Sequence, residues 1–287
     1  MSNQLAIRTH MRDPPESIVC HAQSHIFQYE SGGASLHSQA QMIPVRPRDG
    51  VNLTRSDIER AFVGDTHGGH KAPTHLISLE NTFSGVVMPI EDMQEIAAFA
   101  RERHVAVHLD GARLWDAAAV SGVEIRRYAD CVDSLNLCLS KGMGCPVGAL
   151  LVGSAEFIQK ARHFRKVFGG GWRQAGILAA AGLFAIEHIW PTMEATHRRA
   201  VRLADGLVAL GFELALPVHT SMVLLRDPPA MRAQQALIDA LRPKGVVLGN
   251  FYEGSLRIVL HHQISDECVD IVLEEARKVI ELLGKEK

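Results

Sequence analysis

The sequence predicts an α/β protein with a mainly parallel sheet in a large domain, followed by a small α+β domain at the carboxyl end. Two observations lead to this prediction. Short apolar or β-branched runs alternate with amphipathic helical stretches through most of the chain, which is typical of a parallel α/β sheet. From about residue 193 the pattern changes to a long helix, short strands and a final helix. We therefore expect residues 1–192 to form the large domain and residues 193–287 the small one.

The individual elements follow from hydrophobic periodicity. The chain begins with residues that have the spacing of an amphipathic helix. The predicted strands of the large domain then lie at 17–20, 42–45, 75–79, 105–109, 134–139 and 149–152. The predicted helices between and after them lie at 56–62, 89–103, 155–167 and 173–188. In the small domain we expect helices at 193–210 and 231–242, strands near 213–215, 221–225 and 255–260, and a last helix from Asp266.

The composition excludes several classes of protein. Hydrophobic residues make up 47% of the chain and charged residues 22%, as in a soluble globular protein. The formal net charge is −2 and no basic block occurs, so we expect no nucleic-acid partner. The longest apolar stretch, 176–186, is shorter than the roughly 20 residues that cross a bilayer, so we expect no membrane partner. The five cysteines form no CxxC pair and no secretory signal is evident, which favours a cytoplasmic protein.

Two motifs place chemically useful residues where predicted strands end. Asp110 ends an apolar strand, at the edge where open α/β sheets bind their ligands. Lys141 lies between an apolar strand and a glycine-rich apolar segment, which predicts a desolvated amine with a lowered pKa, suited to imine formation. Taken singly, Asp110 could cap the next helix and Lys141 could lie in a surface turn. Separated by about one strand–helix–strand unit, however, the two together are the arrangement that holds pyridoxal phosphate.

Three other features carry less information. Three glycines precede a helix near Arg173, which favours an anion site but is equally consistent with a hinge. Arg257, in a strand of the small domain, could clamp a carboxylate, although a solvated strand residue is the commoner case. A metal centre needs three or four converging ligands, and among 15 histidines close pairs such as those that include His25 and His70 arise by chance, so we predict no metal.

In combination these segments resemble one family. The motifs HLDGAR (108–113), LSKGMG (139–144) and FGGGWRQAG (168–176) are similar to those of the low-specificity L-threonine aldolases, which are fold-type-I pyridoxal phosphate enzymes. SHIFQYESGGAS (24–35) and LISLENT (76–82) agree with the same family. The resemblance implies a cofactor-binding large domain. It also implies retro-aldol cleavage of L-threonine, L-allo-threonine or a related β-hydroxy-α-amino acid to glycine and an aldehyde.

The resemblance further implies roles toward the cofactor. Lys141 is similar to the lysine that links covalently to pyridoxal phosphate, and Asp110 to the partner of the pyridinium nitrogen. His25 resembles the histidine stacked on the cofactor ring. Arg173 resembles an arginine that reaches the cofactor phosphate across a subunit boundary, and a homo-oligomer, either a dimer or a tetramer, is implied with it.

Roles toward the substrate are implied in the same way. Arg113 and Arg257 resemble the pair that holds the substrate carboxylate. His70 is similar to a second active-site histidine that helps to deprotonate the β-hydroxyl group.

The chain also departs from the family pattern. Phe83 and Ser84 stand where the family has a His-Asn pair after LENT. The family has a longer amino-terminal segment with a phosphate-cradling loop, so we expect this chain to lack that segment and to bind pyridoxal phosphate weakly. Two alternatives stay open: an alanine racemase of the same family, and a catalytically impaired member retained as an assembly partner.

Overall fold

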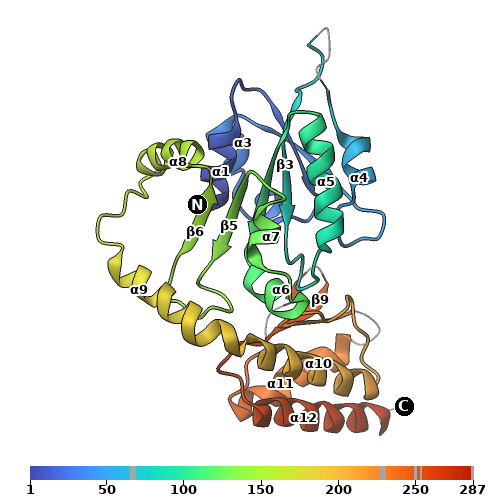
Figure 1. The fold of residues 1–287 in the computed structure, drawn as a ribbon. Coiled ribbons are helices and arrows are strands. Elements are labelled where there is room, and N and C mark those ends of the chain that lie inside the picture. Colours follow the sequence, from blue (N-terminus) through green and yellow to red (C-terminus); the bar gives the residue numbers. More distant parts are fainter. Residues whose placement is uncertain (65–68, 227–230, 249–250, 253, 286–287) are drawn as a thin grey trace. The chain divides into compact units, whose positions relative to one another are not determined.

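The structure is a computed structural model of the chain, and it describes residues 1–64, 69–226, 231–248, 251–252 and 254–285. The chain divides into two compact units (Figure 1). The first consists of Met1–Phe83 and Val87–Ala185, and the second of Ser84–Val86 and Ile186–Lys287. The domain boundary expected from the sequence, at 192/193, lies a few residues after Ile186, where the second unit resumes.

A six-stranded sheet forms the centre of the first unit, in the order β2-β1-β3-β4-β5-β6. Strands β1 to β5 are parallel, and β6 pairs antiparallel with β5 at one edge. The mainly parallel sheet is confirmed, and all six predicted strands are present. Their bounds are Ser17–His21 (β1), Gln41–Val45 (β2), Thr74–Glu80 (β3), Ala106–Gly111 (β4), Ser134–Cys138 (β5) and Ala149–Gly153 (β6).

Helices cover both faces of this sheet (Figure 1). One group packs around α1, which contacts α3, α8 and strands β3 to β6, and the other contains α4, α5 and α7. Covering both faces explains why nearly every residue of β1, β3, β4 and β5 is buried, polar residues included. The helices are Ser2–His10 (α1), His25–Gln28 (α2), Gly33–Ser38 (α3), Arg55–Ala61 (α4), Ile90–Glu102 (α5), Leu114–Ser121 (α6), Ile125–Ala129 (α7), Ala155–Val167 (α8) and Gly176–Phe184 (α9).

The ends of two helices follow directly from local sequence. At α4, the Thr54 hydroxyl accepts from the Asp57 N–H while the Asp57 carboxylate accepts from the Thr54 N–H, which is a capping box. At α8, the Ser154 hydroxyl accepts from the Phe157 N–H, and the helix spans the predicted 155–167. The helix expected from 173 begins later, at Gly176, and continues into a π turn at Ala185–Ile189 and a 3₁₀ turn at Trp190–Thr192.

Helices α6 and α7 are not predicted from the sequence, and the reasons are physical. In α6 the first five residues, from Leu114 to Ala118, are all buried, so the helix has no polar face and no visible period. In α7 only five residues are helical, which is too short for the pattern to be recognised.

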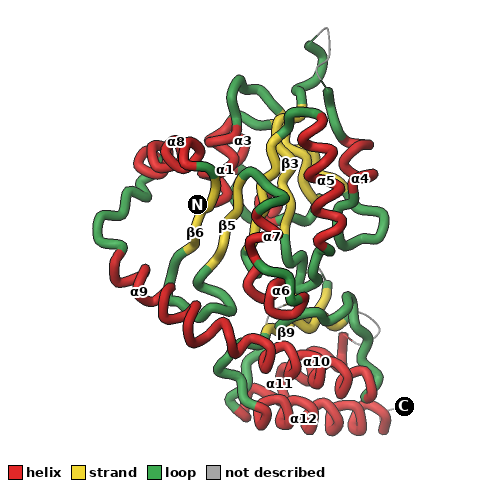
Figure 2. The backbone as a smooth tube through the Cα atoms, in the orientation of Figure 1, coloured by secondary structure: helices red, strands yellow, loops and turns green. Residues whose placement is uncertain are grey.

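The second unit is the predicted α+β structure, in which helices pack with a small sheet (Figure 2). The sheet is antiparallel, in the order β7-β9-β8. Leu207, Val223, Leu237 and Leu256 belong to its core. The strand expected near 213–215 is wrong, because Leu214 forms only an isolated bridge to Leu225. The elements are Met193–Ala209 (α10), Met222–Leu225 (β7), Met231–Leu241 (α11), a 3₁₀ turn at Arg242–Lys244, Phe251–Tyr252 (β8), Ser255–Val259 (β9) and Asp266–Lys285 (α12).

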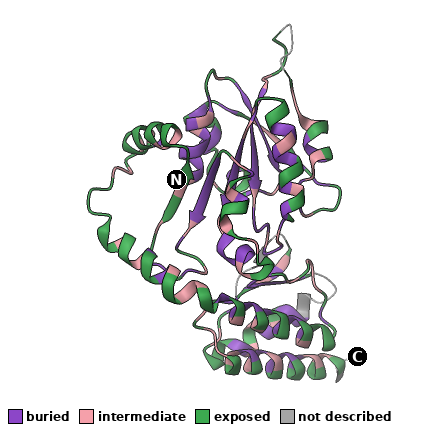
Figure 3. Ribbon diagram, viewed as in Figure 1, coloured by how far each residue is buried: buried purple, intermediate pink, exposed green. Residues whose placement is uncertain are grey.

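One helical run within the described residues, Gly176–Ala209, is long and apolar enough by length and composition to cross a membrane. This is a weak indication, because core helices of soluble proteins pass the same test. In the most apolar stretch 17% of the residues are buried, and exposed residues run along α9 (Figure 3).

Candidate active site

Three neighbouring strands bring polar residues to one edge of the sheet. Glu80 ends β3 and lies beside Asp110 on β4, which in turn lies beside Asn136 on β5. Lys141 is the third residue after Cys138, where β5 ends. A Cβ on Gly111 would lie 2.4 Å from the Asn136 carbonyl oxygen, so glycine after Asp110 lets the two strands approach each other. The predicted convergence of Asp110 and Lys141 on this edge therefore follows from the strand order.

The Asp110 carboxylate is buried and held by three donors. Its Oδ2 accepts from Asn3 Nδ2 at 2.7 Å, and its Oδ1 accepts from Asn136 Nδ2 at 3.1 Å and from the Ala112 N–H at 3.0 Å. The N-cap residue of α6 is Arg113, so Asp110 does not cap that helix. The carboxylate is fixed in orientation by groups from three separate segments.

Lys141 is exposed, so the predicted desolvation of its amine is wrong. After β5 the chain turns back on itself, with the Cys145 N–H donating to the Leu139 carbonyl and the Gly144 N–H to the Lys141 carbonyl. In this turn the neighbouring apolar side chains, Leu139, Met143 and Cys145, are buried, while Lys141 lies outside them. An exposed amine on this edge is accessible to a bound carbonyl compound.

His25, at the start of α2, is paired with a carboxylate to which the sequence analysis gives no role. Its Nδ1 lies 2.9 Å from Glu30 Oε1, which also accepts from Asn3 Nδ2 at 2.8 Å; Glu30 Oε2 accepts from Gln4 Nε2 at 2.5 Å. Burial alone would raise the pKa of Glu30, but the hydrogen bonds from His25, Gln4 and Asn3 outweigh it and lower that pKa to about 2. The hydrogen bond to Glu30 in turn raises the pKa of His25.

Glu80 is a further carboxylate of the site without a predicted role. Its Oε2 accepts from the His25 backbone N–H at 3.0 Å. Burial, followed by the nearby Asp110 charge, raises the pKa of Glu80 to about 7, against the opposing effects of His25 and Lys141. Glu80 is part of the LENT segment, which the sequence identifies. Its burial beside Asp110, however, depends on the fold and has no signal in the sequence.

Replacing Glu30 with glutamine is expected to lower the pKa of His25 toward 6.5, because the carboxylate that stabilises the imidazolium loses its charge. Since the folded-state pKa of His25 is raised, its stabilising contribution is complete below pH 6.5 and is lost as the pH rises through the folded value. A pH series of the His25 ring-proton NMR signal measures this. Glu59→Gln is the control, because the Glu59 carboxylate pairs with Arg55 on α4 and not with His25. An unchanged His25 midpoint in Glu30→Gln would contradict the pairing.

The other predicted residues occupy different surroundings. Arg113 is half-buried and lies three residues after Asp110, at the N-cap of α6. Arg173 is exposed in the segment before α9, and His70 is exposed in the segment before β3. Arg257 belongs to the second unit, where it is half-buried on β9 opposite Leu224.

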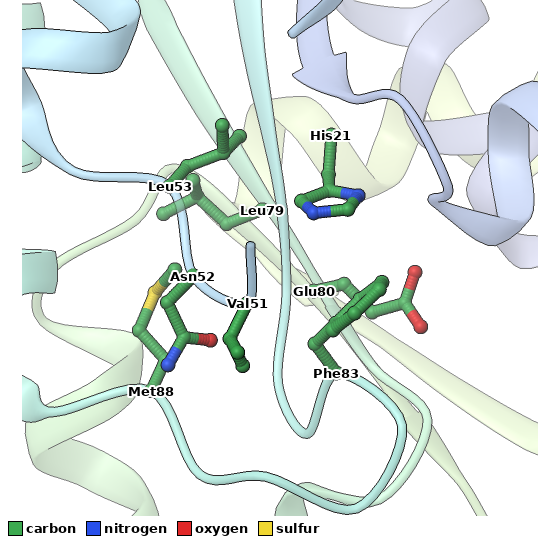
Figure 4. Close-up of a pocket in the computed structure, with 8 residues that line it drawn as sticks. All are labelled: His21, Val51, Asn52, Leu53, Leu79, Glu80, Phe83 and Met88. Carbon is green, nitrogen blue, oxygen red and sulfur yellow. The ribbon is translucent and has the colours of Figure 1, made fainter. Parts of the chain in front are cut away.

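Phe83 occupies the position where the sequence departs from the family pattern. Its buried ring lies 4.2 Å from the His21 ring, centroid to centroid. Both rings line a cavity of about 10 Å³ together with Asn52 and Glu80 (Figure 4). The Glu80 carboxylate points away from this cavity, which is large enough for about one water molecule and far too small for a cofactor ring. Phe83 is therefore part of the packing beneath the site.

The residues at the sheet edge fit pyridoxal phosphate by their donor and acceptor chemistry. A carboxylate offers about four acceptor positions, and three of those on Asp110 are occupied, which leaves one for a single pyridinium N–H. The His25 side chain is 53% exposed, so a face of its ring is available for stacking, and the Lys141 amine is exposed.

Three potential metal ligands also lie at this edge of the sheet, but they already have hydrogen-bond partners. His25, Glu30 and Asp110 offer ligand atoms within 4.8 Å of one another. However, the Asn3 amide already donates to both carboxylates, and His25 is already paired with Glu30. We therefore keep the prediction that these residues hold no metal.

Residues 1–227 match the model of the family described as beta-eliminating lyase. The chain is 40% identical over 279 residues to a probable low-specificity L-threonine aldolase of Schizosaccharomyces pombe, covering 97% of this chain and 72% of that one. It is 42% identical over 273 residues to the low-specificity L-threonine aldolase of Candida albicans, covering 95% and 72%. The alanine racemase TOXG of Cochliobolus carbonum is more distant, at 33% identity over 282 residues, covering 96% and 71%.

Solved structures share the fold. A threonine aldolase of Leishmania major superimposes with a TM-score of 0.80 at 19% identity, covering 97% of this chain and 82% of that one. A high-resolution structure of SPT with PLP gives a TM-score of 0.70 at 19% identity, covering 99% and 71%. At these identities the likeness establishes the fold-type-I architecture that the sequence analysis expects.

Proposed function

The chain belongs to the beta-eliminating lyase family, and from this membership we propose that it is a pyridoxal phosphate-dependent aldehyde-lyase. Its substrate is L-threonine, L-allo-threonine or a related β-hydroxy-α-amino acid, which it cleaves to glycine and an aldehyde. The observation that carries the proposal is the meeting of Asp110, Lys141 and the His25–Glu30 pair at one edge of the sheet.

Four residues hold the cofactor in this proposal. Lys141 links to it covalently, Asp110 accepts from its ring nitrogen, His25 stacks on its ring and Arg173 contacts its phosphate. When bound, pyridoxal phosphate withdraws electrons from the bonds at the substrate Cα. The anionic form of Asp110, held by Asn3, Asn136 and the Ala112 N–H, keeps the ring nitrogen protonated.

The protein's own residues then orient the substrate and move protons. Arg113 and Arg257 would bind the substrate carboxylate and so orient the substrate for cleavage of its Cα–Cβ bond. The hydrogen bond to Glu30 raises the pKa of His25 and holds its ring in place. Because His70 resembles the second active-site histidine of the family, we assign removal of the β-hydroxyl proton to this exposed residue.

We also propose a homo-oligomer in a cytoplasmic setting. Helix α9 exposes Ile177 (83%), Leu183 (63%) and Phe184 (57%), and apolar patches of this kind are typical of protein interfaces. An interface here would bring Arg173, just before α9, toward a neighbouring subunit. All five cysteines are free, as expected in a reducing compartment.

Incubation of the protein with pyridoxal phosphate and L-threonine is expected to yield glycine and acetaldehyde in equal amounts. The measurement is chromatography of both products, with a reaction lacking cofactor as the control. L-alanine is tested in parallel by chiral chromatography. Formation of D-alanine without glycine would favour the racemase alternative, for which the 33% identity to a racemase is the supporting observation. Neither product, at full cofactor occupancy, would favour an impaired family member.

A further inference from the structure

Helix α1 places a single amide between two carboxylates of the site. Asn3 Nδ2 lies 2.7 Å from Asp110 Oδ2 and 2.8 Å from Glu30 Oε1. Ionised carboxylates only accept, so both hydrogens of this amide are donated. The ligand atoms of Glu30 and Asp110 lie within 4.8 Å of each other. The buried Asn3 side chain thus separates two like charges that would otherwise repel each other.

A buried histidine supports Asn3 from behind. Because the Asn3 amide nitrogen donates, Asn3 Oδ1 is its acceptor, and His108 Nε2 at 3.2 Å must carry the hydrogen. Burial lowers the pKa of His108 to about 4, against the opposing effects of Asp110 and the Ser134 backbone. The ring is therefore neutral near pH 7, and its Nδ1 is an acceptor.

From His108 the hydrogen bonds continue away from the site, and all of them have the same donor-to-acceptor direction. The Ser134 hydroxyl, 2.8 Å from His108 Nδ1, donates to it, and it accepts from His10 Nε2 at 2.7 Å. Burial, then the charges of nearby His108, His75, Lys160 and Arg12, lowers the pKa of His10 to about 3, so this ring is neutral as well. In the series His10, Ser134, His108 and Asn3, each side chain thus donates a hydrogen bond to the next, and Asn3 donates to the carboxylates.

We propose that Asn3 is a positioning residue for Asp110, and that His108 and Ser134 fix the orientation in which Asn3 donates. The proposal rests on the proposed function, because Asp110 is useful in this way only as the partner of the cofactor nitrogen. Asn136 and the Ala112 N–H both hold Oδ1, whereas Asn3 holds Oδ2. Without Asn3 the second oxygen loses this donor, and no amide remains between it and the Glu30 carboxylate.

The protonation state of His108 tests the direction of these hydrogen bonds independently of any cofactor. Long-range ¹H–¹⁵N NMR spectra of histidine-labelled apoprotein at pH 7 distinguish the two neutral tautomers and the imidazolium. We expect neutral His108 with its proton on Nε2. A charged ring, or a proton on Nδ1, would overturn the direction of the chain and with it the role of Asn3.

Cofactor titration tests the consequence for Asp110. Asn3→Ala is expected to bind pyridoxal phosphate about ten- to a hundred-fold more weakly than the wild type, the size of one hydrogen bond to a charged group. His108→Gln, which keeps an Nε2 donor, is expected to retain more affinity than His108→Leu. Thr9→Ala is the matched control on α1, because the buried Thr9 hydroxyl donates only within its own helix, to the Leu5 carbonyl.

Failure of the positioning role and failure of the proposed function give different results. Equal affinity of Asn3→Ala and wild type, with Thr9→Ala also unchanged, would overturn the positioning role. Equal losses in Asn3→Ala and Thr9→Ala, matched by equal losses in melting temperature, would overturn it too, since they would show general destabilisation of α1. A wild type that binds no pyridoxal phosphate would refute the proposed function, while the tautomer of His108 would still decide the chain of hydrogen bonds.

Discussion

Replacing Lys141 with alanine is expected to lower the turnover of threonine on the order of 10⁴-fold or more, because it removes the amine that links to the cofactor. The visible absorption of a lysine-linked cofactor should be lost as well. Folding should be little affected, since Lys141 is exposed and substitutions of exposed residues usually change the free energy of unfolding by less than about 0.5 kcal/mol. The measurements are steady-state kinetics, an absorption spectrum and a melting curve.

The control for this variant is Lys166→Ala, which removes an exposed lysine from α8. It should keep both the activity and the visible absorption of the wild type. Retention of more than a tenth of the wild-type turnover in Lys141→Ala would contradict the assigned role, because a covalent lysine cannot be dispensable.

Replacing Asp110 with asparagine is expected to lower kcat about 10³-fold while leaving the covalent link through Lys141 intact. The variant lacks the negative charge that keeps the ring nitrogen protonated. The NH2 group of the new asparagine also replaces one carboxylate oxygen. It then faces either Asn3 Nδ2 or the Asn136 Nδ2 and Ala112 N–H groups, which are all donors. The measurement is kcat and KM for threonine at saturating cofactor, together with the visible spectrum.

Asp133→Asn is the control for Asp110→Asn. The Asp133 carboxylate, just before β5, accepts from the Val107 N–H on β4. The amide oxygen of asparagine can accept the same hydrogen bond. A comparable loss of kcat in both variants would show that the effect comes from the sheet and not from the charge at Asp110.

Much of the fold was predictable, because hydrophobic periodicity is a local property. The six strands of the first unit and the long helices have clear patterns, and strand order alone brings Asp110 and Lys141 to one edge. Elements without a pattern were not predictable. The almost wholly apolar start of α6 has no period, and the apolar run around Leu214 resembles a strand but pairs only at one isolated bridge.

The candidate site was predictable only in part, because its chemistry depends on contacts between distant segments. Asn3 reaches Glu30 across 27 positions and Asp110 across 107, and no spacing rule links such residues. Glu30 and Glu80 stood inside recognised motifs, but their opposite pKa shifts depend on which donors surround each carboxylate. The exposure of Lys141 was mispredicted because its apolar neighbours are buried in a turn that leaves the lysine outside.

Reduction of the protein with borohydride after addition of pyridoxal phosphate, followed by peptide mapping, tests the central claim most directly. The account predicts one stoichiometric cofactor adduct, located on Lys141, together with loss of threonine cleavage in the same sample. An adduct confined to another lysine, or none at cofactor concentrations that support glycine formation, would contradict it.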